Sequence, residues 1–344
     1  MTRNGETPLT MVKICVIGAG IVGLSSATIT QDRFPEATVK IIADRFGNDT
    51  TSWGAGGLFR PSLKHITGTS PQTVRKWCHA SWDRYIGLAQ SSLAKETGIS
   101  LVTGFVASRE NEDFMFKEIT INAHDLSKTE LKRLQLPYNF GVSCTTVITE
   151  VTKYMPWLMK RFQERGGTLE QRTIKNLNEL AGEFDIVINC CGFAALDLVG
   201  DKKVYPIRGQ LVKVKAPWIK HWYLTSDNTY LIPHCDCVII GGCRQKNNFS
   251  TSVDPEMSAD IMMRAKKLFP QLEGAEVIGE WAGLRPCRSP PRIEKEFLFS
   301  QGRKLRIVHN YGHGANGITL SWGTSLDAVD LVEECMNDLR TSKL

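Results

Sequence analysis

A glycine motif near the start of the chain has the spacing that binds the pyrophosphate of a dinucleotide. Gly18, Gly20 and Gly23 form a GxGxxG pattern directly after the apolar run Val12–Ile17 and before a stretch suited to a helix. In such a strand, turn and helix unit, glycine permits the tight turn, lets the phosphates approach the backbone, and lets helix and strand pack closely. Asp44 ends the next predicted strand, at the position where a carboxylate accepts hydrogen bonds from the ribose. The alternative is an aspartate that caps a turn.

Two further segments contain the small residues that a flat cofactor requires. Asp49–Leu58 concentrates threonine, serine and glycine, so its backbone amides and hydroxyls could approach a ligand that larger side chains would obstruct. A flexible glycine-rich turn explains this segment equally well. Gly312–Gly317 is a second glycine loop, between a buried strand and the C-terminal helix.

The elements that must position these residues change character along the chain. Thr38–Ala43 and Glu183–Gly192 are apolar runs typical of buried parallel strands. Gly209–Lys215 instead alternates apolar and polar residues, and Tyr230–Pro233 and Cys237–Gly242 flank a short turn, which predicts antiparallel strands and a hairpin. Helices are predicted over about Pro71–Glu96, Val147–Arg165 and Pro255–Leu268, and further strands over Trp281–Pro286 and Leu305–Asn310.

This order of elements predicts an α/β fold with two interleaved domains. One is a Rossmann-like cofactor-binding domain with a parallel sheet, and the other is a substrate domain built on a mostly antiparallel β-sheet. The 344 residues agree with roughly two domains. The predicted boundaries are 11–60, 145–200 and 285–344 for the cofactor domain, and 61–144 and 201–284 for the substrate domain.

Composition excludes several classes of protein. The charged fraction of 23% and hydrophobic fraction of 42% are ordinary for a globular chain, which excludes fibrous and largely unfolded proteins. The net charge of +6 includes no run of five like charges, so we expect neither a nucleic-acid partner nor a membrane partner. The ten cysteines form no CxxC pair, so we expect no metal site and no disulfide framework. Residues 1–10 lack the apolar core of a secretory signal.

Taken together, these segments resemble the D-amino-acid oxidase family of FAD enzymes. The resemblance runs from end to end, and several motifs in the right order are far more specific than a dinucleotide fingerprint. Gly241–Lys246 is similar to the version in members that act on acidic substrates, where an arginine replaces a neutral residue. The remaining matching segments are Ile17–Gly23, Asp44-Arg45, Asp49–Ser52, Tyr205–Gln210, Gly283–Pro286, and Asn310–Gly314 through Trp322-Gly323.

The resemblance implies a set of site residues. Arg285 would hold the substrate α-carboxylate and Tyr230 would donate a hydrogen bond to it, so these two are the catalytic residues. Arg244 and Ala315 would complete the substrate contacts. The helix that begins near Gly314–Thr319 would point its N-terminus at the flavin and stabilise its reduced form. Contacts with FAD are implied for Gly18, Ala19, Gly20, Ile21, Gly23, Asp44, Arg45, Thr51, Ser52, Gly57, Ile174, Gly314, Asn316, Gly317, Ile318 and Thr319.

The implied reaction is the oxidative deamination of acidic D-amino acids by hydride transfer to flavin. D-Aspartate, together with D-glutamate and N-methyl-D-aspartate, would react with O2 and water to give the 2-oxo acid, ammonia and hydrogen peroxide. Ser226 stands where oxidases of neutral substrates have a second pocket tyrosine. The main alternative is an oxidase of neutral D-amino acids. From other classes, a nicotinamide dehydrogenase would not need the loop Gly312–Gly317, and a non-catalytic flavoprotein would not need Tyr230 and Arg285.

The charges of the two arginines fit an acidic substrate independently of the resemblance. A dicarboxylate carries two charges that must not be buried unpaired, and Arg244 and Arg285 can each bind one carboxylate in bidentate fashion. The alternatives are that Arg285 lies on a surface rim and that Arg244 lies in an exposed turn. His309 and His313 are candidates for a general base, but we expect a structural role or a place beside the flavin for them.

The last three residues, Ser342-Lys343-Leu344, match the tripeptide that the peroxisomal import receptor reads at a free carboxyl terminus. The alternative is the frayed end of a helix, because Leu326–Leu339 has helical apolar spacing. An enzyme that releases hydrogen peroxide belongs where peroxide is destroyed, so we expect the peroxisomal matrix. The expected partners are thus the substrate, O2 and the import receptor. The oligomeric state is not predicted.

Overall fold

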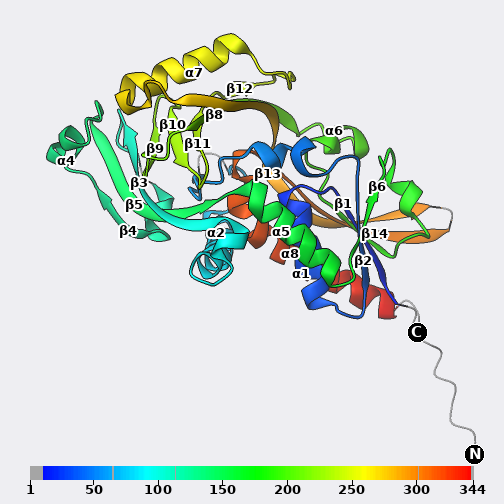
Figure 1. Ribbon diagram of the computed structural model, residues 1–344. Helices are drawn as coiled ribbons and strands as arrows, with labels where there is room; N and C mark the ends of the chain where they lie inside the picture. The colour runs from blue at the N-terminus through cyan, green and yellow to red at the C-terminus, as the bar shows by residue number, and fades with distance from the viewer. Residues whose placement is uncertain (1–10, 64–65, 113, 301, 342–344) are drawn as a thin grey trace, which may run out of the picture.

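The structure is a computed structural model that describes residues 11–63, 66–112, 114–300 and 302–341. The strands in these residues form one 14-stranded sheet, in the order β4-β5-β3-β9-β10-β11-β8-β13-β14-β7-β1-β2-β6, with β12 paired to β8. Figure 1 shows this sheet running through the molecule, with helices packed along it. The mixed α/β architecture confirms the predicted fold class.

Five strands at one end of the sheet are parallel to one another. They are β14 (Arg303–His313), β7 (Ile186–Asn189), β1 (Lys13–Ile17), β2 (Thr38–Ala43) and β6 (Thr168–Gln171). Ile14 and Val16 of β1 belong to one buried cluster, whereas Cys15 and Ile17 belong to another on the opposite face. Because both faces of β1 are covered, the strand is apolar throughout, as its sequence predicted.

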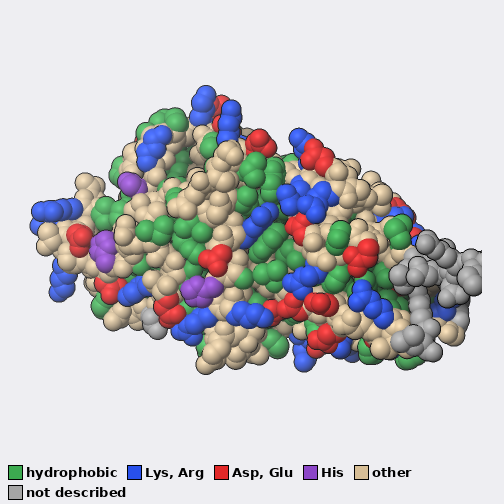
Figure 2. All heavy atoms as spheres, turned by 90° about the horizontal axis from the view of Figure 1, so that it is seen from below, with side chains coloured by type: hydrophobic (Ala, Val, Ile, Leu, Met, Phe, Trp, Pro, Cys, Tyr) green, Lys and Arg blue, Asp and Glu red, His purple; other side chains and the backbone are tan. Residues whose placement is uncertain are grey.

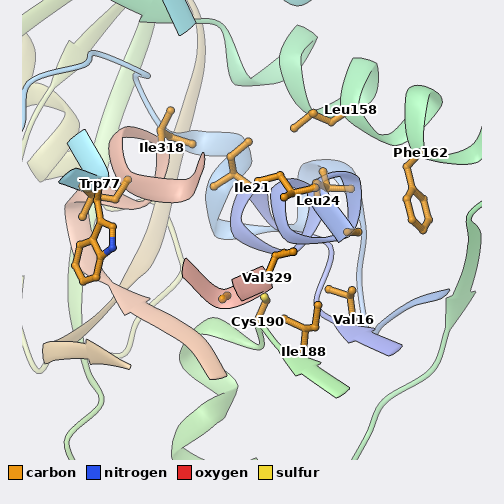
Figure 3. Close-up of a cluster of buried hydrophobic side chains, with 14 of the residues drawn as sticks. Val16, Ile21, Leu24, Trp77, Leu158, Phe162, Ile188, Cys190, Ile318 and Val329 are labelled. Atoms are coloured by element: carbon orange, nitrogen blue, oxygen red, sulfur yellow. The ribbon is translucent and has the colours of Figure 1, made fainter. Parts of the chain in front are cut away.

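Three helices cover one face of the parallel strands, and α2 packs against one of them. They are α1 (Ile21–Arg33), α5 (Val151–Glu164) and α8 (Gly317–Thr341), and α2 (Pro71–Ala89) lies along α8. In Figure 3, Leu24 of α1 lies between Leu158 of α5 and the strand residues Val16 and Ile188, and Val329 of α8 lies beside the strands; all five belong to one buried cluster. This cluster forms the largest part of the hydrophobic core in the described residues.

The other half of the sheet is mostly antiparallel. It contains β8 (Tyr205–Lys215), β9 (Trp222–Thr225), β10 (Tyr230–Pro233), β11 (Val238–Gly241), β12 (Gln245–Lys246), β3 (Ile99–Ser108), β4 (Ile121–Asp125) and β5 (Phe140–Thr149), of which β3 and β9 form a parallel pair. The predicted hairpin is confirmed as β10 and β11, and the predicted helix Pro255–Leu268 is confirmed as α7. The short helices are α3 (Ala94–Thr97), α4 (Lys128–Arg133) and α6 (Ala195–Leu198).

Two features of the sheet differ from the sequence prediction. The strand predicted over Trp281–Pro286 is the middle of β13 (Glu276–Ser300), which pairs with β8 along its first part and with β14 along its second. A single strand therefore crosses the predicted boundary between 284 and 285, and the division into domains stays a prediction. The helix predicted from Val147 begins at Val151, because Val147–Thr149 belong to β5.

The surface and the cysteines complete this description. All ten cysteines are free thiols. No helix in the described residues has the length and hydropathy needed to span a bilayer. On the face seen in Figure 2, lysine and arginine side chains alternate with aspartate and glutamate rather than forming a patch of one sign.

Candidate active site

A cavity of about 940 Å³ collects the residues that the sequence analysis selected. This is within the usual range for sites of small molecules and cofactors, roughly 300–1,000 Å³. The turn between β1 and α1, the loop from Asp44 to Ser62, and the segment Tyr311–Thr319 line one part of it. Side chains from β10, the turn after β11, and β13 line the remainder, so both halves of the sheet contribute.

The glycine motif brings the N-terminus of α1 to the cavity. Gly18 has a φ of +100°, and a Cβ atom there would lie 2.6 Å from the carbonyl oxygen of Cys190, so only glycine fits without strain. No side chain caps α1 at Gly20, and its first turn contains no acidic residue. The Ile21 N–H donates to Oγ of Ser52 at 3.1 Å. Ala19, Gly20 and Ile21 line the cavity, so this helix end can bind an anionic pyrophosphate.

Gly23 serves a different purpose from the other two glycines of the motif. It does not line the cavity. A Cβ atom at Gly23 would lie 1.9 Å from the Gly18 carbonyl oxygen, so its role in this structure is to let α1 pack on the turn. Gly57 does line the cavity, and its φ of +71° brings its backbone against β5, where it accepts a hydrogen bond of 2.9 Å from the Thr149 N–H.

The predicted ribose and flavin positions also lie on the cavity. Asp44 follows β2 and pairs with Arg45 at 3.0 Å, and both residues line the cavity beside Thr51. Asn316 is 5% exposed, and its Nδ2 has no hydrogen-bond partner among the described residues. A buried amide donor that faces a cavity without a partner indicates a ligand acceptor. The other predicted residues of this loop that line the cavity are Gly314, Ala315, Gly317, Ile318 and Thr319.

Ile174 is the one predicted cofactor residue, besides Gly23, that the structure does not bring to the cavity. Its side chain packs against the buried cluster that contains Leu177 and Leu180, on the other side of the parallel strands. The remaining predicted cofactor contacts come together although they are spread over most of the chain.

Arg285 lines the cavity from β13, and neighbouring backbone orients its guanidinium. Its Nη1 donates to the carbonyl oxygens of Cys243 at 3.1 Å and Arg208 at 3.4 Å. Gly209 lies across from Gly283 on β8, and a Cβ atom at Gly209 would lie 2.3 Å from Nη2 of Arg285. The guanidinium thus occupies space that any other residue at 209 would fill. Arg285 is partly buried, so it does not lie on an open rim.

Tyr230 and Arg244 lie beside Arg285. The Tyr230 ring packs over Gly241 and Gly242, and burial raises the pKa of its phenol while the positive charge of Arg285 opposes this rise. The phenol is therefore protonated at neutral pH and can donate a hydrogen bond. Arg244 is exposed and also lines the cavity; the protein around it and the charge of Arg285 lower its pKa. Two mutually repelling guanidiniums in one cavity favour an anionic ligand.

The two histidines differ in position. His313 lines the cavity, its Nε2 lies 2.9 Å from Oγ1 of Thr324, and burial lowers its pKa to about 4. His309 is fully buried between Asn189 and Glu296, with Nε2 3.2 Å from Oε1 of the glutamate, and does not line the cavity. His309 thus has a structural place. His313 has the cavity-facing place that was expected, in its neutral form.

Sequence reasoning missed three charged residues of the cavity, Arg60, Glu112 and Asp197. None of them belongs to a motif or follows a recognisable spacing. The one available signal was the position of Arg60 directly after the glycine-rich segment Asp49–Leu58.

The chain is similar to known proteins over nearly its whole length. A family model described as FAD dependent oxidoreductase matches residues 13–331. The chain is 39% identical to D-aspartate oxidase of Homo sapiens, covering 96% of this chain and 97% of that protein. It is 34% identical to D-aspartate oxidase 1 of Caenorhabditis elegans and also 34% identical to a D-amino acid oxidase of Dugesia ryukyuensis, covering 94% of this chain and 98% of each relative.

Solved structures share the fold at low sequence identity. Glycine oxidase from Geobacillus kaustophilus superposes with a TM-score of 0.76 at 21% identity, covering 94% of this chain and 95% of that one. A Mycoplasma pneumoniae L-alpha-glycerophosphate oxidase with FAD bound superposes with a TM-score of 0.68 at 13% identity, over 94% and 95% of the two chains.

Proposed function

This chain belongs to the family of FAD-dependent oxidoreductases that includes the D-aspartate and D-amino-acid oxidases, and from that premise we propose that its substrates are acidic D-amino acids. At the coarser level the chain is an FAD-dependent amino-acid oxidase. The proposed substrates are D-aspartate, D-glutamate and N-methyl-D-aspartate, and the proposed products are the 2-oxo acid, ammonia and hydrogen peroxide. The observation that carries the proposal is the pair of guanidiniums, Arg244 and Arg285, in one cavity.

The residues present fit FAD. The N-terminus of α1 has no side-chain cap, Gly18 and Gly20 line the cavity with bare backbone, and the unpartnered Nδ2 of Asn316 supplies a donor for a polar edge of the flavin. When bound, FAD supplies a two-electron acceptor for the hydrogen on the substrate Cα and passes the electrons to O2. The protein's own contribution is to bind and orient the substrate.

Arg285 and Tyr230 hold the α-carboxylate in this proposal. The guanidinium is oriented by the carbonyl oxygens of Cys243 and Arg208, which restricts the direction of its remaining N–H groups. The protonated phenol of Tyr230 adds a second donor beside it. Two fixed donors on one carboxylate set the position of the adjacent Cα, and such orientation contributes a large part of the rate acceleration in enzymes.

Arg244 binds the side-chain carboxylate in this proposal. The positive charge of Arg285 lowers the pKa of Arg244, so the two guanidiniums repel each other across the cavity. A substrate with two carboxylates neutralises both, whereas a substrate with one leaves the Arg244 charge unpaired. The names of the relatives from Homo sapiens and Caenorhabditis elegans, both D-aspartate oxidases, support the same choice.

No side-chain base is needed at the substrate Cα. His313, the histidine that lines the cavity, is hydrogen-bonded to Thr324, and its pKa of about 4 makes it a weak base. The substrate amine therefore has to lose its proton to water before the Cα hydrogen leaves. The chain's contribution at this step is a positive environment that favours electron-rich flavin.

The experiment is an assay of peroxide release by the holoenzyme on a panel of amino acids. We expect turnover with D-aspartate, D-glutamate and N-methyl-D-aspartate, at least about tenfold lower kcat/KM with D-alanine and D-asparagine, and none with L-aspartate. Equal or higher kcat/KM with neutral D-amino acids would instead support the alternative, an oxidase of neutral D-amino acids, which the name of the Dugesia ryukyuensis relative favours.

The location of the enzyme is a separate part of the proposal. Ser342-Lys343-Leu344 lies outside the described residues, and its sequence and the peroxide product support import into the peroxisomal matrix through the import receptor. A fluorescent protein fused in front of the chain should co-localise with a peroxisomal marker and become diffuse when these three residues are removed. A punctate pattern without them would contradict this route.

A further inference from the structure

Arg60 is a cationic side chain in the substrate cavity that the function above does not use. It is partly buried and lines the cavity with Arg244 and Arg285, and no ion pair or hydrogen bond joins its guanidinium to a residue that the structure describes. Its guanidinium lies 5.9 Å from the ring centre of Phe116. A partly buried charge that no direct ion pair neutralises is unfavourable, and the carboxylate that acts on it, Glu112, lies beyond ion-pair distance; such a cavity favours an anionic ligand.

The backbone before Arg60 is held firmly against β5. The Thr149 N–H donates to the Gly57 carbonyl oxygen at 2.9 Å, and the Phe59 N–H donates to the Val147 carbonyl oxygen at 2.9 Å. Oγ1 of Thr146 donates to the Phe59 carbonyl oxygen at 2.7 Å. Arg60 therefore projects from a segment that is fixed to the antiparallel half of the sheet, and its position does not depend on a free loop.

The charge of Arg60 interacts with that of Arg244, which in turn interacts with that of Arg285. The pKa of Arg60 is lowered to about 10, mainly by burial; the charge of Glu112 opposes this fall and the charge of Arg244 adds to it. The charge of Arg285 in turn lowers the pKa of Arg244. Arg244 thus interacts with both of the other guanidiniums. Glu112 also lines the cavity and is the carboxylate that acts on Arg60 in the described residues.

We propose that Arg60 is a specificity-determining residue that binds the side-chain carboxylate of the substrate together with Arg244. The proposal rests on the function proposed above, because it needs a substrate with two carboxylates. Arg285 and Tyr230 hold one carboxylate, and the second is held between a guanidinium from the segment after Gly57 and a guanidinium from the turn after β11. Two guanidiniums around one carboxylate raise the affinity for a charged side chain over a neutral side chain of the same size.

The test uses two substrates of nearly equal shape and different charge, D-aspartate and D-asparagine. In holoenzyme carrying Arg60→Gln, we expect KM for D-aspartate to rise about tenfold or more, kcat to change less than about threefold, and KM for D-asparagine to stay the same or fall. Arg60→Lys should retain more of the preference for D-aspartate. Arg133→Gln removes one exposed charge that does not line the cavity and is the matched control, which should leave both KM values unchanged.

Binding without turnover provides a second readout. Succinate has two carboxylates and butanoate has one, and both can be titrated by the change in flavin absorption. We expect Arg60→Gln to weaken succinate about tenfold and butanoate less than about twofold. An unchanged ratio of the two dissociation constants, or an unchanged ratio of the two KM values, would overturn the role of Arg60.

Two further controls separate a failure of the Arg60 proposal from a failure of folding or of the proposed function. If Arg60→Gln fails to fold or loses FAD, Glu112→Gln replaces it, because removing the carboxylate that acts on Arg60 should lower KM for D-aspartate and leave D-asparagine unchanged; an unchanged KM for D-aspartate would contradict the proposal. A wild-type enzyme with no preference for D-aspartate over D-asparagine would refute the proposed function itself. A wild-type preference that persists in Arg60→Gln would refute only the role of Arg60.

Discussion

Arg285 and Tyr230 each occupy space that a side chain on a neighbouring strand would otherwise fill. A Cβ atom at Gly209 would lie 2.3 Å from Nη2 of Arg285, and one at Gly241 would lie 2.0 Å from Cζ of Tyr230. Both glycines lie in paired strands, so their backbones cannot easily move away. At the scale of the residue, the positions of Arg285 and Tyr230 in the cavity therefore depend on the absence of side chains at Gly209 and Gly241.

Arg285→Ala should remove turnover of every substrate while FAD stays bound. Among the described residues the guanidinium donates to two carbonyl oxygens and acts on the Tyr230 phenol, and no carboxylate pairs with it, so its loss leaves no unpaired buried carboxylate. We expect kcat/KM for D-aspartate and for D-alanine to fall by at least about a hundredfold. The visible absorption of the purified variant, near roughly 450 nm for bound flavin, reports the cofactor. Colourless protein would show that Arg285 has a structural role instead.

Arg244→Ala should act on acidic substrates alone. One of the charged contacts to the side-chain carboxylate is lost, so KM for D-aspartate should rise by about an order of magnitude or more. KM for D-alanine should stay within about twofold, because that substrate never reaches the guanidinium. Steady-state kinetics on both substrates measures the difference, and equal losses on the two would argue against the assignment of Arg244.

At the scale of the element, the site depends on how closely α1 packs on the turn that precedes it. A Cβ atom at Gly23 would lie 1.9 Å from the carbonyl oxygen of Gly18 and 2.9 Å from its carbonyl carbon. These are backbone atoms of the turn that lines the cavity, so the helix would have to shift. If FAD binds at this turn as proposed, packing in the core and binding of the cofactor are coupled through a residue outside the cavity lining.

Gly23→Ala should lower both stability and FAD affinity. Forcing α1 away from the turn should cost about 1–3 kcal/mol in the free energy of unfolding, measured by urea denaturation of the holoenzyme, and should raise the dissociation constant of FAD. Gly87→Ala is the matched control, since Gly87 lies in α2 and no atom comes within 4 Å of an added Cβ. We expect that control to stabilise the protein slightly. A Gly23→Ala variant as stable as wild type would contradict the packing argument.

At the scale of the whole molecule, the positive charge that could bind an anionic substrate is concentrated in the cavity. The net charge of +6 is distributed over a surface on which both signs alternate in the view of Figure 2. The cavity, in contrast, gathers Arg60, Arg244 and Arg285 from three segments that lie far apart in the chain. A continuous sheet makes this possible. β13 pairs with β8 of the antiparallel half and with β14 of the parallel half, so residues of the two halves keep fixed positions relative to each other.

Buried histidine should make the molecule sensitive to acid. Burial lowers the pKa of His313 from 6.5 to about 4, so the unfolded chain binds its proton at a higher pH than the folded chain does. The stability that this neutral histidine contributes is complete above about pH 6.5 and is lost as the pH falls towards about 4. We expect His313→Gln to flatten the fall in unfolding free energy over this window, by on the order of 3 kcal/mol. A parallel pH dependence in both proteins would show that His313 is not responsible.

The elements that were predicted correctly are those whose signal lies within a short stretch of chain. The strand, glycine turn and helix at Val12–Ile29, the hairpin of β10 and β11, and α7 each depend on local periodicity and turn residues. The strands β3 and β4 were not among the predicted elements, and the end of β5 was assigned to a helix. Those strands are stabilised by partners distant in the sequence, and β-propensity depends strongly on such neighbours.

By itself the sequence determined the glycine turn, the family and the two arginines proposed for the substrate, because motif spacing and residue chemistry are properties of the chain. Only the tertiary structure decided that Gly23 packs a helix, that Ile174 packs outside the cavity lining, and that Arg60 lines the same cavity as Arg244. The physical reason is that a cavity and its electrostatic field are made by side chains from distant segments. Their distances are set by how the strands pair, which no single stretch of sequence encodes.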